Sequence, residues 1–316
     1  MTTTTPTPAT AALTVTGRMS LAAESAHHKL TSPWASLAAV VIAVLWTVPT
    51  VGLFISSFRP EEDVKGSGWW TFFSDPSVTL ENYRSVLTGS DTQLATYFVN
   101  SIVITVPSVL IPITLASMAA YAFAWMRFPG RNILFVAVFA LQIVPLQVTM
   151  IPLLSLYVTP PFGLPSLAGS EAPGGGFYTI WLSHTIFALP LAIYLLHNFM
   201  REIPGELVES ARVDGAGHVQ IFTRIMLPLM VPAIAAFGIF QFLWVWNDLL
   251  VALVFGGGNL DVSPLTVRLA ELSGTRGQDW HLLSAGAFVS LVVPLIVFLS
   301  LQRFFLRGLL AGSVKG

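Results

Sequence analysis

Cysteine is absent from this chain of 316 residues, and charged residues are scarce. Without cysteine there is no disulfide, no thiolate metal site and no cysteine nucleophile. Only 10% of the residues are charged and 54% are apolar, whereas soluble domains carry roughly 25% charged residues. A soluble particle with so much apolar surface would aggregate. The composition therefore excludes a soluble enzyme and a disordered chain, and it predicts an all-α membrane protein.

Several chemical motifs are missing as well. No G-x-x-x-x-G-K-[ST] phosphate loop is present, so the chain cannot bind ATP by that route. No H-E-x-x-H pair offers a metal site, and no G-x-S-x-G turn accompanies Ser183 and His184. The net charge of −1 gives no basic excess for nucleic acid. We therefore expect no catalytic residue, no metal or cofactor site, no nucleic-acid partner and no enzyme activity.

Long apolar runs are abundant by contrast. A helix needs roughly 20 apolar residues to cross a bilayer. Six stretches meet this length, at residues 35–58, 98–125, 133–157, 178–199, 229–255 and 282–305. Each contains proline, which kinks helices. Two interpretations remain open: the prolines are merely tolerated in membrane helices, or the helices are bent and broken around a substrate path.

The distribution of basic residues predicts the orientation. Ten Lys and Arg residues fall on the side of the two termini and five on the other side. The positive-inside rule then places both termini in the cytoplasm of a bacterial cell, in a multi-pass plasma-membrane protein. Residues 1–32 are predicted to be a disordered cytoplasmic tail, and residues 33–316 a single six-span domain. The outer loops are 59–97, 158–177 and 256–281.

Asp248 is the one acidic residue inside a predicted span. An ionisable residue within a membrane span is a functional candidate by default. Asp248 lies near the outer end of its span, beside two tryptophans. The sequence leaves two roles open: a structural polar contact, or a residue that lines a solute path. No chain of acidic residues and histidines accompanies it, which argues against an ion-coupled transporter.

The cytoplasmic loop at residues 200–228 has the pattern of two short helices joined by a turn. Pro204 suits a first helical turn, and Glu206 and Glu209 follow where a helix dipole favours negative charge. Gly215 can adopt a left-handed cap. A second amphipathic helix is predicted to present one apolar face, formed by Val219, Phe222 and Ile225. A structured loop of this length between membrane helices indicates a docking site for a partner.

The same loop carries a family resemblance. Glu209-Ser210-Ala211 is followed by Gly215 after three residues, and by Ile225 and Leu227-Pro228 after nine more. This spacing resembles the EAA loop (E-A-A-x₃-G-x₉-I-x-L-P) of permeases in ATP-binding-cassette (ABC) importers, with serine replacing one alanine. With six spans, residues 33–316 are similar to the MalG-type carbohydrate permeases. Stretches 244–250, 276–283 and 308–316 look most similar to their α-glucoside branch.

The resemblance implies a type I permease fold and a set of partners. These are separate ATPase subunits that use the ATP, a second permease subunit and an extracellular solute-binding protein. The EAA loop would couple the spans to the ATPase, and residues 308–316 would also contact it. The implied coupling residues are Glu206, Glu209, Ser210, Ala211, Asp214, Gly215, Ala216 and Phe222. Candidate residues for the path or outer gate are Asn247, Asp248, Gly256, Gly257 and Gly258.

The implied function is that of a permease subunit in an ATP-driven sugar importer, which forms the path for an oligosaccharide such as an α-glucoside. Two alternatives remain. The chain is a permease for a polyol or another small solute, or it is a membrane scaffold that transports nothing. The sugar-contacting residues cannot be identified from the sequence.

Overall fold

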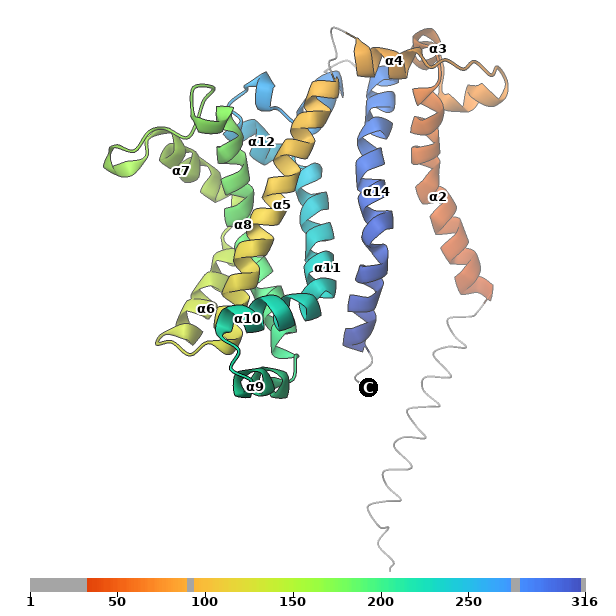
Figure 1. The fold of residues 1–316 in the computed structure, drawn as a ribbon. Helices are drawn as coiled ribbons and strands as arrows, with labels where there is room; N and C mark the ends of the chain where they lie inside the picture. The colour runs from red at the N-terminus through yellow and green to blue at the C-terminus, as the bar shows by residue number, and fades with distance from the viewer. Residues whose placement is uncertain (1–32, 90–93, 274–278, 314–316) are drawn as a thin grey trace, which may run out of the picture.

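The computed structural model describes residues 33–89, 94–273 and 279–313, and these residues form a bundle of long helices (Figure 1). The tail predicted to be disordered, residues 1–32, lies outside the described residues. Five stretches are long and apolar enough to cross a membrane, at Pro33–Ser57, Leu94–Trp125, Gly174–Arg201, His218–Trp246 and Trp280–Gln302. No strand occurs in the described part of the chain. The predicted all-α membrane architecture is therefore confirmed.

The long elements are α2 (Pro33–Ser57), α5 (Leu94–Trp125), α8 (Phe177–Arg201), α11 (Leu227–Trp246) and α14 (Trp280–Ser313). Shorter helices cap the two ends of the bundle. At one end lie α3 (Glu61–Gly66), η1 (Trp69–Phe73), α4 (Glu81–Thr88), η3 (Pro161–Gly163), η4 (Pro173–Gly176), α12 (Leu250–Phe255), η6 (Leu260–Val262) and α13 (Leu265–Ser273). At the other end lie α9 (Gly205–Val213), α10 (His218–Ile221) and a π-helical turn, η5 (Phe222–Met226).

The third predicted span, residues 133–157, is broken rather than straight. It consists of α6 (Arg131–Ala140) with η2 (Leu141–Ile143), followed by α7 (Leu146–Val158), and the two halves meet at 104°. The break falls at Val144 and Pro145, which are both extended, with ψ angles of 121° and 130°. Proline forces the preceding residue out of the helical region and has no N–H to continue the ladder. This predicted span therefore consists of two helices, one that ends before the break and one that begins after it.

The other prolines of the predicted spans lie inside continuous helices, and the structure shows how Pro107 is accommodated. Proline at position i leaves the carbonyl of residue i−4 without its helical partner. In α5 that carbonyl belongs to Val103, and it accepts a hydrogen bond of 2.9 Å from the indole N–H of Trp181 on α8. The carbonyl that loses its partner within α5 is thereby used for a hydrogen bond between α5 and α8.

The same arrangement recurs at two more prolines. The carbonyl freed by Pro112 accepts from a side-chain amide of α11, and the carbonyl freed by Pro294 in α14 accepts from an indole of α11. The donor and acceptor pairs are Gln241 Nε2 with Ser108 O at 3.3 Å, and Trp246 Nε1 with Ser290 O at 3.2 Å. The structure therefore contains a broken helix at Pro145 and continuous helices at Pro107, Pro112 and Pro294.

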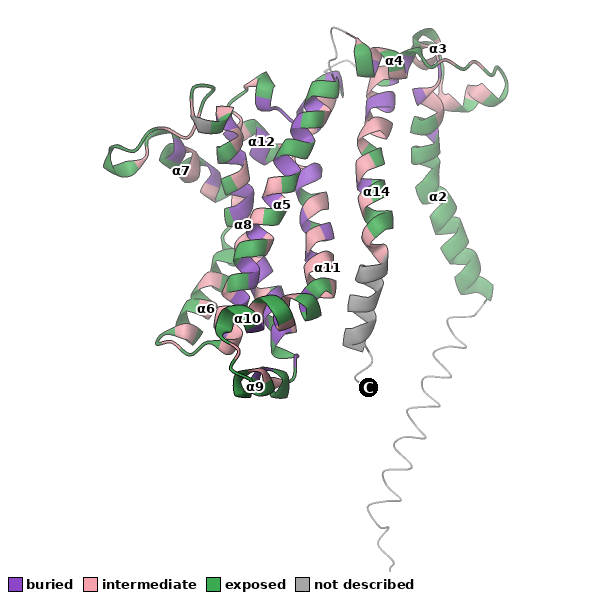
Figure 2. Ribbon diagram, viewed as in Figure 1, coloured by how far each residue is buried: buried purple, intermediate pink, exposed green. Residues whose placement is uncertain are grey.

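Burial divides the bundle into a core and a periphery (Figure 2). Helices α5, α8 and α11 pack against one another and hold most of the buried side chains. Helix α2 packs on α14 and η1, and only Gly52 and Ser57 of α2 are buried. Its remaining apolar surface is exposed in the isolated chain, as expected of a helix that faces lipid or another subunit.

Candidate coupling surface and solute cavity

The segment at residues 200–228 folds as two helices around a glycine turn, as the sequence predicts. Helix α9 ends at Val213, and Gly215 follows with a φ angle of +82°. The turn is closed by backbone bonds of 3.0 Å from Gly215 N to Arg212 O and 2.9 Å from Ala216 N to Ala211 O. Only glycine adopts this left-handed conformation without steric cost. The sequence motif therefore requires glycine at this position for a geometric reason.

The second helix of the segment does not end before the membrane. Helix α10 continues through the π-helical turn η5 into α11, so His218–Trp246 is one helical stretch. A π turn contains one more residue than an α turn and changes which side chains share a face. Val219, predicted to share one apolar face with Phe222 and Ile225, is 75% exposed, whereas Ile221 is buried. The predicted face is therefore wrong at Val219, while Phe222 and Ile225 are half-buried.

The inner face of the segment packs against the end of the bundle that is predicted to face the cytoplasm. Val208 and Ile221 are buried in a cluster with side chains from α5 and α8. Tyr121 of α5 contacts the segment directly: its hydroxyl lies 2.9 Å from His218 Nδ1, and its ring centroid lies 5.3 Å from that of Phe222. The segment is thus a rigid extension of the bundle.

The outer face of the segment is free for a partner. Glu206 and Glu209 are exposed and form no ion pair among the described residues, and Val213 is 88% exposed. Ser210, Asp214 and Gly215 are exposed as well, whereas Ala211, Ala216 and Phe222 are half-buried against the core cluster. The eight implied coupling residues therefore divide into an exposed set and a supporting set. Exposed Val213 was not predicted, although an apolar residue outside the buried stripe is the signal for it.

A cavity of about 720 Å³ lies beside the break between α6 and α7, bounded also by α8 and α11. Its polar lining comes from Gln142, Thr149, His184 and Gln241, and its aromatic lining includes Phe187, Phe237, Phe240 and Trp244. His184 is 2% exposed, and its Nε2 atom has no hydrogen-bond partner in the described structure. The cavity could not be located from the sequence, because its walls come from three stretches that are distant along the chain, at residues 141–156, 184–191 and 237–244.

Asp248 and Asn247 lie at a second helix break, between α11 and α12. The Asp248 carboxylate accepts backbone hydrogen bonds from Val251 (3.4 Å) and Ala252 (3.1 Å), and so caps α12. The Asn247 side chain bonds to Leu243 O at 2.8 Å within its own helix. Neither residue is among those that line the cavity in the described structure. Asp248 is nevertheless 3.8 Å from His184 Nε2, which does line it.

The glycine triplet follows α12 in a tight turn. Gly256 bonds to Ala252 O at 2.9 Å, and Gly257 and Gly258 have φ angles of +62° and +73°. Such angles favour glycine over any residue with a side chain. The triplet lies away from the cavity, at the end of the bundle that carries α12 (Figure 1). It begins the 256–281 loop, of which residues 274–278 lie outside the described structure.

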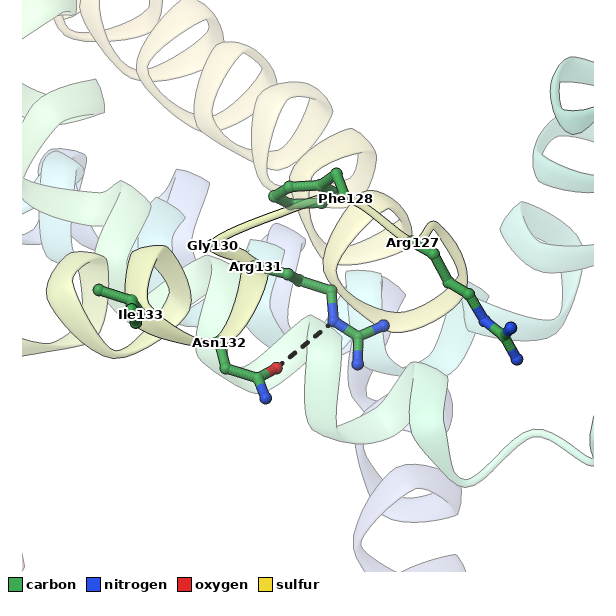
Figure 3. Close-up of a pocket in the computed structure, with 6 residues that line it drawn as sticks. All are labelled: Arg127, Phe128, Gly130, Arg131, Asn132 and Ile133. Carbon is green, nitrogen blue, oxygen red and sulfur yellow. Dashed lines mark hydrogen bonds between the residues drawn. The ribbon is translucent and has the colours of Figure 1, made fainter.

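A second, more open cavity of about 530 Å³ lies at the turn between α5 and α6 (Figure 3). It is lined by Arg127, Phe128, Gly130, Arg131, Asn132 and Ile133. Arg131 donates to Met126 O at 3.2 Å and to Asn132 Oδ1 at 3.4 Å. This small basic turn is at the same end of the bundle as α9 and α10.

Comparisons with known proteins extend these observations. Residues 112–310 match the family described as the binding-protein-dependent transport system inner membrane component. The chain is 53% identical to the osmoprotective compounds uptake permease protein GgtD of Synechocystis sp., over 88% of this chain and 91% of that protein. It is 51% identical to the α-glucoside transport system permease protein AglG of Rhizobium meliloti, over 85% of this chain and 70% of that protein.

Among solved structures, a similar chain occurs in a bacterial ABC transporter involved in the import of the acidic polysaccharide alginate. The TM-score is 0.65 at 20% sequence identity, over 87% of this chain and 98% of that chain. That likeness shows the fold of an ABC importer permease, consistent with the broken six-span bundle. The chain therefore belongs to the family of binding-protein-dependent transport system inner membrane components.

Proposed function

We propose that this chain is a permease subunit of an ATP-driven importer for oligosaccharides of the α-glucoside type. The observation that carries the proposal is the exposed outer face of the 200–228 segment, on a chain without a phosphate loop of its own. Separate ATPase subunits would dock on Glu206, Glu209 and Val213. The chain itself would catalyse no reaction, and ATP would be used by those subunits.

The arrangement of the ends supports the orientation proposed from the basic residues. The 200–228 segment and the C-terminal end of α14 lie at one end of the bundle, and α3, α4 and α12 lie at the other (Figure 1). With the first end in the cytoplasm, the 256–281 loop would face an extracellular solute-binding protein. Residues 308–316, proposed to contact the ATPase, include the last turns of α14, and 314–316 lie outside the described residues.

The 720 Å³ cavity supports a sugar as the solute. Small-molecule sites are typically pockets of about 300–1,000 Å³ with apolar walls and a few placed polar groups. A sugar presents apolar ring faces and hydroxyls, which match the aromatic walls and the groups His184, Gln142 and Gln241. A second permease subunit would close the exposed side of this path.

The names of the relatives support an α-glucoside as the solute, and they also support a second class of solute. AglG is named for α-glucoside transport, whereas GgtD is named for osmoprotective compounds and is slightly more similar to this chain. The second candidate is therefore a small osmoprotective solute, such as a polyol. Family membership leaves the scaffold alternative without support.

The test is binding of both solute classes to the cognate binding protein, followed by ATP-dependent uptake into proteoliposomes that contain the assembled transporter. We expect α-linked oligosaccharides to bind and to be taken up, and to displace one another. Uptake of polyols without α-glucosides would replace the first candidate with the second. Absence of ATP-dependent uptake for either class would overturn the transport function.

A further inference from the structure

Helix α5 is hydrogen-bonded at both of its ends to segments that would meet partners under the proposed function. At one end it binds the 256–281 loop, and at the other it binds the 200–228 segment. It is also the longest helix of the core, with 32 residues.

The outer end of α5 is joined to the loop by three hydrogen bonds, two of them buried and one part-buried. Asn100 Nδ2 donates to Asp261 O at 2.9 Å and to Ser263 O at 3.1 Å. The Ser101 hydroxyl accepts from the backbone N–H of Leu265 at 2.8 Å. Asn100 and Ser101 are 7% and 2% exposed. Buried backbone groups without partners are costly, so these bonds hold the loop in one position.

The inner end of α5 is fastened to the 200–228 segment by Tyr121. Its hydroxyl bonds to His218 Nδ1, and its ring packs on Phe222, at the start of the π turn that leads into α11. Tyr121 is 5% exposed. A displacement of α10 therefore moves Tyr121 with it, or breaks the bond and separates the rings.

Between these ends, α5 is stiffer than its two prolines suggest. The carbonyls freed by Pro107 and Pro112 are held by Trp181 of α8 and Gln241 of α11. The helix runs without a break from Leu94 to Trp125. Ser101 and Tyr121 are 20 residues apart, which corresponds to about 30 Å along the axis. A stiff helix transmits displacement over this distance, whereas a kinked one would absorb it.

We propose that α5 is a strut that couples the 256–281 loop to the 200–228 segment, so that a loaded binding protein docked outside accelerates ATP hydrolysis inside. The inference rests on the proposed function and goes beyond it, because it assigns the communication to one helix. Asn100, Ser101 and Tyr121 act as positioning residues in this account, since they touch neither solute nor ATPase. Coupling requires that a displacement of the outer end of α5 also displaces its inner end.

The test uses the complete transporter in nanodiscs, with ATP hydrolysis measured with and without solute-loaded binding protein. Ser101→Ala removes the acceptor at the outer end, and Tyr121→Phe removes the hydroxyl at the inner end but keeps the ring. Each is expected to reduce the stimulation about fivefold, the factor that corresponds to one lost hydrogen bond, while basal hydrolysis stays unchanged. Thr114→Ala is the matched control, because exposed Thr114 on α5 bonds only to Leu110 O of its own helix.

The double variant gives the sharpest outcome. Residues this far apart normally have independent effects, which would multiply to about 25-fold. If both residues act through one helix, a weakened attachment at either end already limits the transmission, and the double variant is expected to stay near the fivefold reduction of each single variant. Multiplied effects, or normal stimulation in either single variant, would overturn the role of α5. If basal hydrolysis fell in proportion, the residues would be merely structural, which also overturns it. A wild-type transporter without any stimulation would contradict the proposed function itself.

Discussion

Gly215 is the residue on which the shape of the 200–228 segment depends most clearly. Its φ of +82° lies in the left-handed region, which costs a residue with a side chain roughly 1–2 kcal/mol. Gly217, two residues on, has an ordinary φ of −78° and open space around its Cα. The two glycines therefore have different requirements, although the sequence alone presents them alike.

Replacing Gly215 should therefore uncouple the transporter. We expect Gly215→Ala to tilt or loosen α9, to lower solute uptake per ATP hydrolysed, and to leave assembly of the membrane bundle intact. Gly217→Ala is the matched control and is expected to behave as the wild type. Uptake and hydrolysis in one reconstituted preparation measure the ratio, and an unchanged ratio in Gly215→Ala would refute the role of this turn.

Some structural features of the 200–228 segment could be predicted from the sequence, and others could not. The turn at Gly215 was predictable because its cause is local, in the backbone preference of glycine. The exposure of Val219 was not, because it depends on which side of α10 packs against the core, where Ile221 is buried instead. The burial of Val208 and half-burial of Ala211 agree with a local pattern, because apolar residues three positions apart share one face of a helix.

At the scale of elements, proline has two opposite effects that the sequence cannot separate. Pro145 breaks a span because Val144 before it is extended and proline has no N–H to continue the helix. Pro107 leaves its helix continuous, with the freed carbonyl bound by Trp181, 78 residues further along the chain. Which outcome occurs depends on the tertiary neighbour, so the 720 Å³ cavity beside the break was unpredictable.

The Trp181 bond can be tested by a double-variant cycle. Trp181→Phe removes the indole N–H and is expected to destabilise the protein by about 1 kcal/mol, measured by unfolding in mixed detergent micelles. In a Pro107→Ala background the Val103 carbonyl regains its helical partner, and Trp181→Phe should then lose most of this effect. Equal destabilisation in both backgrounds would mean that the indole acts only through packing.

At the scale of the whole molecule, the absence of cysteine makes the orientation directly measurable. Single cysteines can be introduced at exposed positions on opposite ends, with Ser210→Cys on α9 and Ser74→Cys beside η1. In intact cells, a membrane-impermeant maleimide is expected to label the second and to spare the first until the membrane is opened. Labelling of Ser210→Cys in intact cells would reverse the proposed topology.

The whole molecule also shows why its membrane topology could be predicted from the sequence while its internal contacts could not. The number of apolar stretches and the charge bias follow from the bilayer, a constraint that acts on every residue. The contacts among α5, α8 and α11 follow from side chains that meet across the bundle, such as Gln241 with Ser108. The architecture was therefore accessible from the sequence, whereas the cavity and the connections between its ends required the structure.

The central claim is that this chain couples a separate ATPase to solute entry through the exposed face of the 200–228 segment. The most direct measurement is uptake of a radiolabelled α-glucoside into proteoliposomes that contain the assembled transporter, with Glu209→Ala compared with Glu202→Ala as a matched exposed acid. The account predicts uptake that requires both ATP and the binding protein, is lost in Glu209→Ala and persists in Glu202→Ala. Accumulation without the ATPase subunits, or wild-type uptake in Glu209→Ala, would contradict it.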